Sequence, residues 1–164
     1  MQWSYDLLPV PERQLLAWCS VFAGGFTLEA AEQIGTGSAE PVDVLDLLDS
    51  LICKSLVTAE RSGNATRYGL LETIRQFAEE QLSATGESEV TKRRHALFFI
   101  ADSDAHFQIW RGPQQVVAHR WFGREIDNLR VAFRWAVERD SMKQPITRNS
   151  RSSKRSLNLI TWMA

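Results

Sequence analysis

The chain has 164 residues, of which 44% are hydrophobic and 24% are charged, and its formal net charge is −1. This composition is ordinary for a globular protein with a buried core. No run approaches the roughly 20 apolar residues that span a bilayer, and the first residues lack the basic and apolar regions of a secretory signal. We therefore expect a cytoplasmic protein without membrane contact, in which Cys19 and Cys53 are buried and reduced.

Charge is distributed unevenly along the sequence. Residues 1–140 hold 14 basic and 20 acidic side chains, whereas residues 141–164 hold five basic side chains and no acidic one. The last segment is also rich in serine, contains Pro145 and shows no sustained apolar period. We therefore predict a basic disordered tail over residues 141–164. Its cations are Lys143, Arg148, Arg151, Lys154 and Arg155.

The first predicted helix follows a lead-in of residues 1–10. Pro11 suits its first turn, where the missing N–H would have no partner in any case. Apolar residues then recur at helical spacing as far as Phe22, and Gly24-Gly25 ends the pattern. The residues expected to face the core are Leu15, Leu16, Trp18, Cys19 and Phe22.

Two more helices are predicted before residue 55. Thr27 can cap a short helix that Gly35 ends, since Thr favours the first position and Gly the position after the last turn. Asp43 begins the next helix after a loop over residues 35–41. The positions expected on its buried side are Val44, Leu45, Leu48, Leu51 and Ile52.

A β-hairpin is predicted next. Residues 56–60 alternate with a period of two, which is typical of a half-buried strand with Val57 and Ala59 on one face. Ser62-Gly63-Asn64 provides a turn, because Gly and Asn tolerate positive φ. The returning strand carries Tyr68, so that Val57 and Tyr68 lie on opposing strands. Three helices, a hairpin and a further helix are the arrangement of a winged helix, which we predict over residues 11–85.

The second half of the chain is predicted to be helical throughout. One helix ends at Thr85-Gly86, a longer one runs from Glu89 to near Gly112-Pro113, and two others cover residues 115–122 and 124–140. Such helix pairs predict the start of a TPR-like α-solenoid over residues 86–140. The fold class is therefore mostly α with one small β-hairpin. The apolar faces predicted for these helices contain Ile74, Phe77, Ala78 and Leu82, then Ala96, Leu97, Ile100 and Ala101, then Ile126, Leu129, Phe133 and Ala136.

The sequence contains no recognisable catalytic or cofactor-binding constellation. The glycine pair at 24–25 lacks the Lys-Ser/Thr of a phosphate-binding loop, and no G-x-G-x-x-G follows a strand. His95, His106 and His119 are too widely spaced for a metal-binding histidine pair. No Ser, His and Asp set includes a strained nucleophile turn. We therefore expect a protein that is not an enzyme and has no cofactor, metal or small-molecule site.

The charge of the predicted winged helix argues against DNA recognition. A DNA reader needs Lys and Arg on its groove helix and wing to neutralise phosphates. Residues 11–71 instead hold eight acidic and four basic side chains, and Asp43, Asp46 and Asp49 lie along the helix that would enter the groove. We do not expect specific DNA binding. Arg61 and Arg67 on the wing are weak nucleic-acid candidates.

Several segments also carry a family resemblance. They are WSYDLLPVPERQLLAWCSVFAGGFTLEAAEQI, VLDLLDSLICKSLV, RYGLLETIRQFAEEQL, RRHALFF and REIDNLRVAFRWAVER. In this order they resemble the winged-helix and first solenoid segments of bacterial STAND-type ATPase regulators, also called LuxR-type or AfsR-like regulators. The resemblance covers about residues 3–140. It implies a winged helix that couples nucleotide state to sensor repeats rather than one that reads DNA.

The sequence also departs from that family. The resemblance implies an upstream P-loop ATPase domain, downstream helical repeats and, in many members, a terminal helix-turn-helix domain. This chain starts just before the winged helix and abandons the amphipathic pattern after Asp140. No ATPase residue can be carried over. We expect a truncated or frame-shifted relative, with a stand-alone adaptor as the alternative.

The function expected from these observations is regulation through protein–protein contact, with the chain itself or with a full-length relative. A missing solenoid neighbour leaves apolar side chains uncovered, and the candidates are Phe133, Trp135 and Val137. One alternative is a DNA-binding transcriptional regulator that uses its wing and its tail cations Arg151, Lys154 and Arg155. A second alternative is a truncated gene product without a function.

Overall fold

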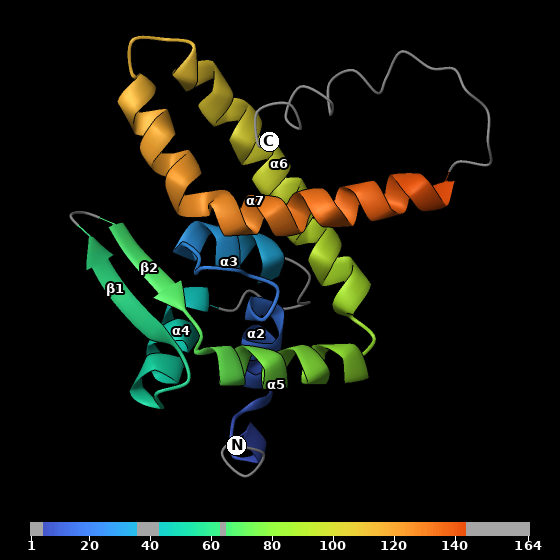
Figure 1. Cartoon of the computed structure of the whole chain (residues 1–164). Helices are drawn as coiled ribbons and strands as arrows, with labels where there is room; N and C mark the ends of the chain where they lie inside the picture. The colour runs from blue at the N-terminus through green and yellow to red at the C-terminus, as the bar shows by residue number, and fades with distance from the viewer. Residues whose placement is uncertain (1–4, 36–42, 63–64, 144–164) are drawn as a thin grey trace.

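The computed structural model describes residues 5–35, 43–62 and 65–143, and Figure 1 shows a mostly helical molecule with one small hairpin. The fold class predicted from the sequence is confirmed. Residues 36–41 of the loop predicted over residues 35–41, residues 63–64 of the predicted turn and the predicted tail beyond residue 143 lie outside the described residues. The helices are α2 (Val10–Cys19), α3 (Leu28–Gly35), α4 (Val44–Cys53), α5 (Glu72–Ala84), α6 (Ser88–Trp110) and α7 (Gln115–Lys143), and the strands are β1 (Thr58–Ser62) and β2 (Ala65–Gly69).

The predicted capping residues begin their helices. At the start of α3 the backbone N–H of Ala30 donates to Oγ1 of Thr27 over 3.2 Å. At the start of α4 the carboxylate of Asp43 accepts from the backbone N–H groups of Leu45 and Asp46. Each side chain satisfies donors that have no partner within the helix. These local signals therefore place α3 and α4 where the sequence predicts them.

The first helix is shorter than predicted. α2 ends at Cys19, so Phe22 is buried beyond the helix rather than in its last turn. Phe22 stacks on Phe26 with ring centroids 4.4 Å apart and meets Phe99 of α6 edge-on. The expectation for the cysteines is confirmed for Cys19 and wrong for Cys53, which is exposed in the last turn of α4.

The hairpin forms the wing. β1 and β2 pair antiparallel, with Ala59 opposite Tyr68, and backbone hydrogen bonds between Phe26 and Tyr68 add a short bridge on the other edge of β2. Val57 lies one residue before β1 and is buried, whereas Ala59 is exposed. The predicted common buried face is therefore wrong. The hairpin lies at one side of the helices (Figure 1), with Thr58 to Arg61 of β1 exposed and most of β2 partly or fully buried.

The helices α6 and α7 pack against each other and rest on the winged helix. An ion pair joins Arg139 near the end of α7 to Glu89 near the start of α6, so the two helices run antiparallel as predicted. The two helices predicted over residues 115–122 and 124–140 are one helix, since Gly123 does not end α7. Figure 1 shows that α7 bends sharply and that its last turns project from the body.

Several predicted apolar faces are rotated. Leu97 and Ile100 of α6 are exposed, and Leu45 of α4 is 40% exposed. The face of α6 that packs inward contains Thr91, His95, Ala96, Phe99 and Ser103, and that of α7 contains Glu125, Asn128, Leu129 and Ala132. Buried polar side chains explain the error, because a search for apolar periodicity treats them as solvent-facing.

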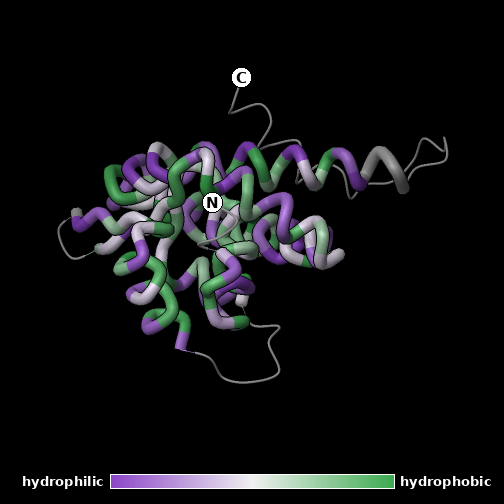
Figure 2. The backbone as a smooth tube through the Cα atoms, turned by 90° about the horizontal axis from the view of Figure 1, so that it is seen from below, coloured by the Kyte–Doolittle hydropathy of each residue, from purple (hydrophilic) through white to green (hydrophobic). Residues whose placement is uncertain are grey.

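Hydrophobic and hydrophilic residues are interspersed along the chain (Figure 2). Among the described helices, none is long and apolar enough to cross a membrane.

Candidate functional site

A tight loop between α2 and α3 lies where the winged helix meets α6 and α7. Gly24 and Gly25 in this loop have φ values of 73° and 94°, a backbone conformation that residues other than glycine adopt only at a cost in free energy. A Cβ on Gly25 would also lie 2.8 Å from the carbonyl oxygen of Tyr68. Glycine is therefore required, and the turn directs the two carbonyl groups toward the wing.

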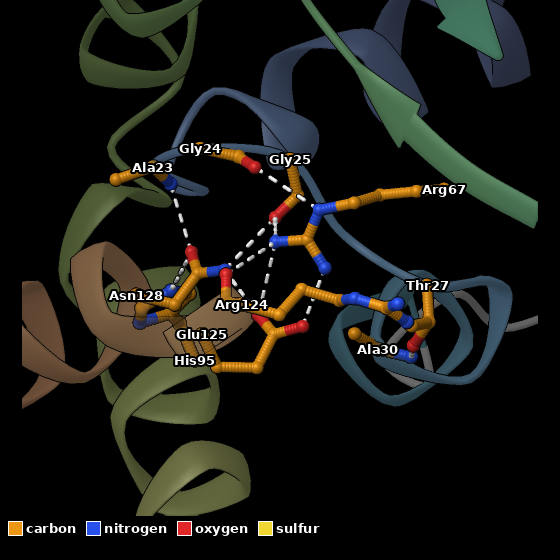
Figure 3. Close-up of polar contacts among 10 residues, drawn as sticks. All are labelled: Ala23, Gly24, Gly25, Thr27, Ala30, Arg67, His95, Arg124, Glu125 and Asn128. Atoms are coloured by element: carbon orange, nitrogen blue, oxygen red, sulfur yellow. Dashed lines mark hydrogen bonds and ion pairs between the residues drawn. The ribbon is translucent and has the colours of Figure 1, made fainter. Parts of the chain in front are cut away.

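Arg67 of β2 binds this loop and α7 at once. Its Nε donates to the carbonyl oxygen of Gly24 over 3.1 Å, and its Nη2 donates to the carbonyl oxygen of Gly25 over 3.1 Å. Both guanidinium Nη atoms pair with the carboxylate of Glu125, and Nη2 also reaches the carbonyl oxygen of Arg124. Figure 3 shows these contacts converging from three segments. The Arg67 side chain is 18% exposed and that of Glu125 is 4% exposed, so the pair is largely removed from water.

Asn128 completes the junction one turn along α7 from Glu125. Its Oδ1 accepts the backbone N–H of Ala23 over 2.8 Å, and its Nδ2 donates to the carbonyl oxygen of Gly25 and to Glu125 over 2.8 Å each. The side chain is fully buried. Because Oδ1 is an acceptor, the contact of 3.3 Å with Nε2 of His95 requires that this histidine nitrogen carries the proton.

His95 of α6 is held neutral in this environment. Its ring lies against Phe22 and Phe99, with centroid distances of 5.4 Å and 4.7 Å. Burial lowers the pKa of His95 from 6.5 to about 4, and the hydrogen bond with Asn128 and the charge of Glu125 oppose this shift only in part. The junction, which we define as Gly24, Gly25, Arg67, His95, Glu125 and Asn128, therefore contains one ion pair and a neutral histidine.

The groove-facing helix of a winged helix would be α4, and its surface is acidic. Asp43, Asp46 and Asp49 are all exposed. Lys54 at its end pairs with the buried carboxylate of Glu12. A duplex that approached α4 would meet three carboxylates, which add repulsion where DNA readers place Arg, Lys or Asn.

The structure separates the predicted nucleic-acid residues. Arg61 is exposed on β1, whereas the donors of Arg67 are engaged within the junction. Arg151, Lys154 and Arg155 lie outside the described residues. The contacts of Arg67 in the structure are thus internal to the fold.

The predicted protein-contact residues do not form one patch. Phe133 and Val137 are four residues apart and share a side of α7, but Trp135 points to another side. Phe133 and Trp135 are half-buried, and Val137 is 43% exposed. Trp135 packs against the core, and the guanidinium group of Arg139 lies over its ring in a cation–π contact, 5.1 Å from the ring centroid.

Sequence reasoning missed the junction itself. Arg67 and Glu125 are 58 positions apart, and each alone has the pattern of a surface residue. One sequence signal could have revealed it. Glu125 and Asn128 are polar residues three positions apart, and they share a side of α7 with the apolar Leu129 and Ala132. Within the described ranges no group of three His, Cys, Asp or Glu side chains could hold a metal ion.

Comparison with known proteins identifies the first part of the chain. Residues 8–83 match the family model of the winged helix-turn-helix domain. The three helices and the wing agree with this match, and the chain therefore contains a winged helix-turn-helix domain.

The chain is also homologous to longer mycobacterial proteins. A protein of Mycobacterium tuberculosis named "Putative HTH-type transcriptional regulator" is 38% identical over 139 residues, which cover 84% of this chain and 16% of the relative. A protein of the same name from Mycobacterium bovis matches equally. An uncharacterized protein of Mycobacterium tuberculosis is 38% identical over 97 residues, which cover 58% of this chain and 25% of the relative. No solved structure matches the chain significantly.

The chain thus spans about one sixth of the first of these relatives. The alignment over 139 residues is longer than the winged helix-turn-helix domain, so the similarity continues into α6 and α7.

Proposed function

We propose that this chain is a non-enzymatic regulatory module that acts through protein–protein contact, as the corresponding part of the STAND-type regulators it resembles is expected to do. The names of its mycobacterial relatives support a role in transcriptional regulation. In this role the winged helix and the α6–α7 pair form one contact unit, and α4 and the wing do not read DNA.

The position of Arg67 is the observation that carries this proposal. A wing arginine that bound phosphate would need free donors, and those of Arg67 contact Glu125 and three backbone carbonyl groups. Freeing it would leave a buried carboxylate without its cation, which costs about 3–5 kcal/mol. The wing is therefore better suited to fixing α7 against the winged helix than to contacting a duplex.

The test is a titration of a labelled duplex pool with the full chain at low and at physiological salt. We expect weak binding without sequence preference, lost steeply as salt rises, because the cations of the basic tail attract phosphates without reading bases. Replacing Arg148, Arg151, Lys154 and Arg155 by Gln should abolish it, whereas Arg61→Gln should change it little. Sequence-selective binding at physiological salt that survives the tail substitutions would overturn the proposal.

That outcome would favour the second candidate, a DNA-binding transcriptional regulator. The observations in its favour are the winged helix-turn-helix match and the names of the relatives. The exposed carboxylates of Asp43, Asp46 and Asp49 on α4 weigh against it.

A further inference from the structure

A cleft of about 830 Å³ lies on the side of the junction that faces α5. The residues that line it come from the loop between α2 and α3, the wing, α5, the start of α6 and the second half of α7. The loop before α3 forms its floor with Phe22 and Phe26, and α7 contributes Val131, Arg134, Trp135 and Glu138. The volume falls in the range of natural ligand sites, about 300–1,000 Å³.

Most of the charged side chains that line the cleft are already paired. Arg75 contacts Glu72 and Glu79, and Glu79 also contacts Lys92. Arg67 is held by Glu125, as described above. Within the described part of the chain, three charged lining residues have no ion-pair partner: Glu60, Glu138 and Arg134. Two of them are acidic and one is basic, so the unpaired side chains of the cleft carry a net negative charge.

Trp135 adds an unsatisfied hydrogen-bond donor to the α7 wall. Its Nε1 is buried and has no acceptor among the described residues. A buried donor without a partner costs about 1–3 kcal/mol. A carbonyl group of a bound ligand that reached this N–H would supply the missing acceptor.

We propose that this cleft binds an extended peptide segment that carries basic side chains. Backbone carbonyl groups of such a segment can accept from Trp135, and its cations can pair with Glu60 and Glu138. The inference rests on the proposed protein-contact function and names the kind of partner. Residues 144–164 of this chain have the required chemistry, with four cations and no carboxylate side chain.

Other ligand classes fit the lining less well. A phosphorylated ligand needs several free cations, but Arg67, Arg75 and Lys92 are engaged by carboxylates. That leaves Arg134 as the one lining cation without an ion-pair partner among the described residues, and it is outnumbered by Glu60 and Glu138. A purely apolar ligand would have to desolvate eight charged side chains of the lining, which is unfavourable.

The test uses nuclear magnetic resonance of the full chain, with the indole N–H signal of Trp135 assigned through Trp135→Phe. A tail-neutral variant, in which Arg148, Arg151, Lys154 and Arg155 are replaced by Gln, removes competition from the chain's own tail. A synthetic peptide of residues 144–164 is then titrated into it. The matched control peptide has Gln at the same four positions.

We expect saturable shifts of the Trp135 indole signal with the basic peptide and at least about fivefold weaker binding of the neutral peptide. Glu60→Gln together with Glu138→Gln should weaken binding by up to about tenfold, as expected for two exposed ion pairs. Glu80→Gln, on α5 but outside the cleft, should leave it unchanged. Absence of shifts, or equal binding of both peptides, would overturn the proposal.

Comparison of the wild-type chain with the tail-neutral variant identifies the source of the segment. A different Trp135 indole signal in the wild-type chain assigns the cleft to its own tail. An identical signal, with binding of the added peptide, assigns it to a segment of another chain. Failure of the peptide without selective DNA binding would reject this cleft but leave protein contact through another surface in place.

Discussion

Two buried glutamates, Glu12 and Glu125, each hold a basic side chain from a distant part of the sequence. Glu12 pairs with Lys54 at the end of α4 and accepts the hydroxyl of Ser50 over 2.8 Å. Glu125 pairs with Arg67 of the wing. A buried charge is tolerated only when its partner is in place, so these two pairs fix the relative positions of the elements that carry them.

Loss of Arg67 should therefore be costly. We expect Arg67→Met to lower the free energy of unfolding by about 3–5 kcal/mol, because Glu125 would remain buried without a cation. The double change Arg67→Met with Glu125→Gln should recover part of this loss. Urea denaturation measures both. Arg130→Met is the matched control, since Arg130 and Asp127 are more than half exposed and such a pair contributes about 0–1 kcal/mol. If Arg67→Met and Arg130→Met lowered the free energy of unfolding equally, the stabilising role of the Arg67–Glu125 pair would be contradicted.

His95 should make stability depend on pH. Its pKa is about 4 in the folded chain against 6.5 for a free side chain. Between these values the unfolded chain binds a proton that the folded chain does not, so stability is full above pH 6.5 and is lost as pH falls toward 4. The loss reaches about 3 kcal/mol at about 1.4 kcal/mol per pKa unit.

This dependence can be assigned to one residue. Denaturation at several pH values between 7 and 5 should show a smaller slope for His95→Gln than for the wild-type chain. His119→Gln is the control because His119 is exposed on α7. If the pH dependence of the unfolding free energy is the same in His95→Gln as in the wild-type chain, the conclusion that His95 is buried and neutral is wrong.

At the scale of elements, the loop between α2 and α3 is the most constrained connection. We expect Gly25→Ala to lower stability by about 3 kcal/mol, through the left-handed conformation and the contact of its Cβ with the Tyr68 carbonyl group. Gly86 also has a positive φ of 76° but has no atom within 4 Å of an added Cβ. Thermal unfolding of Gly86→Ala should therefore show only about 1 kcal/mol of loss. Equal losses would mean that the close approach at Gly25 is unimportant.

The elements were predictable because their signals are local. Thr27 and Asp43 mark the starts of α3 and α4, and Ser62 pairs with Ala65 where the sequence predicts the hairpin to reverse. The junction was not predictable in this way, since Arg67 and Glu125 meet only after β2 and α7 pack together. For the same reason the inward face of α6 was misplaced, because His95 is stabilised by contacts with Asn128 and Phe22 from other elements.

At the scale of the whole molecule, the projecting end of α7 remains the predicted site of self-association (Figures 1 and 2). Val137 is 43% exposed there, near the half-buried Phe133. Exposed apolar surface favours association, so sedimentation should show a concentration-dependent dimer that Val137→Glu weakens. Trp135 is a poorer position for this test than the sequence indicated, because it also packs against the core. Val116→Glu, at the other end of α7, is the control. A chain that stays monomeric at the highest concentration reached would contradict the prediction.

The aromatic and polar contacts across the junction bear on how the chain can be divided. The predicted boundary at residue 85 and the matched region 8–83 both separate Arg67 from Glu125, and Phe22 from Phe99. A fragment that ends there would expose Phe22, and it would leave the carbonyl oxygen of Gly25 and the backbone N–H of Ala23 without the side chain of Asn128. We therefore expect the winged helix-turn-helix domain to be more stable when α6 and α7 are retained, because the contacts of the junction cross the boundary of the family model.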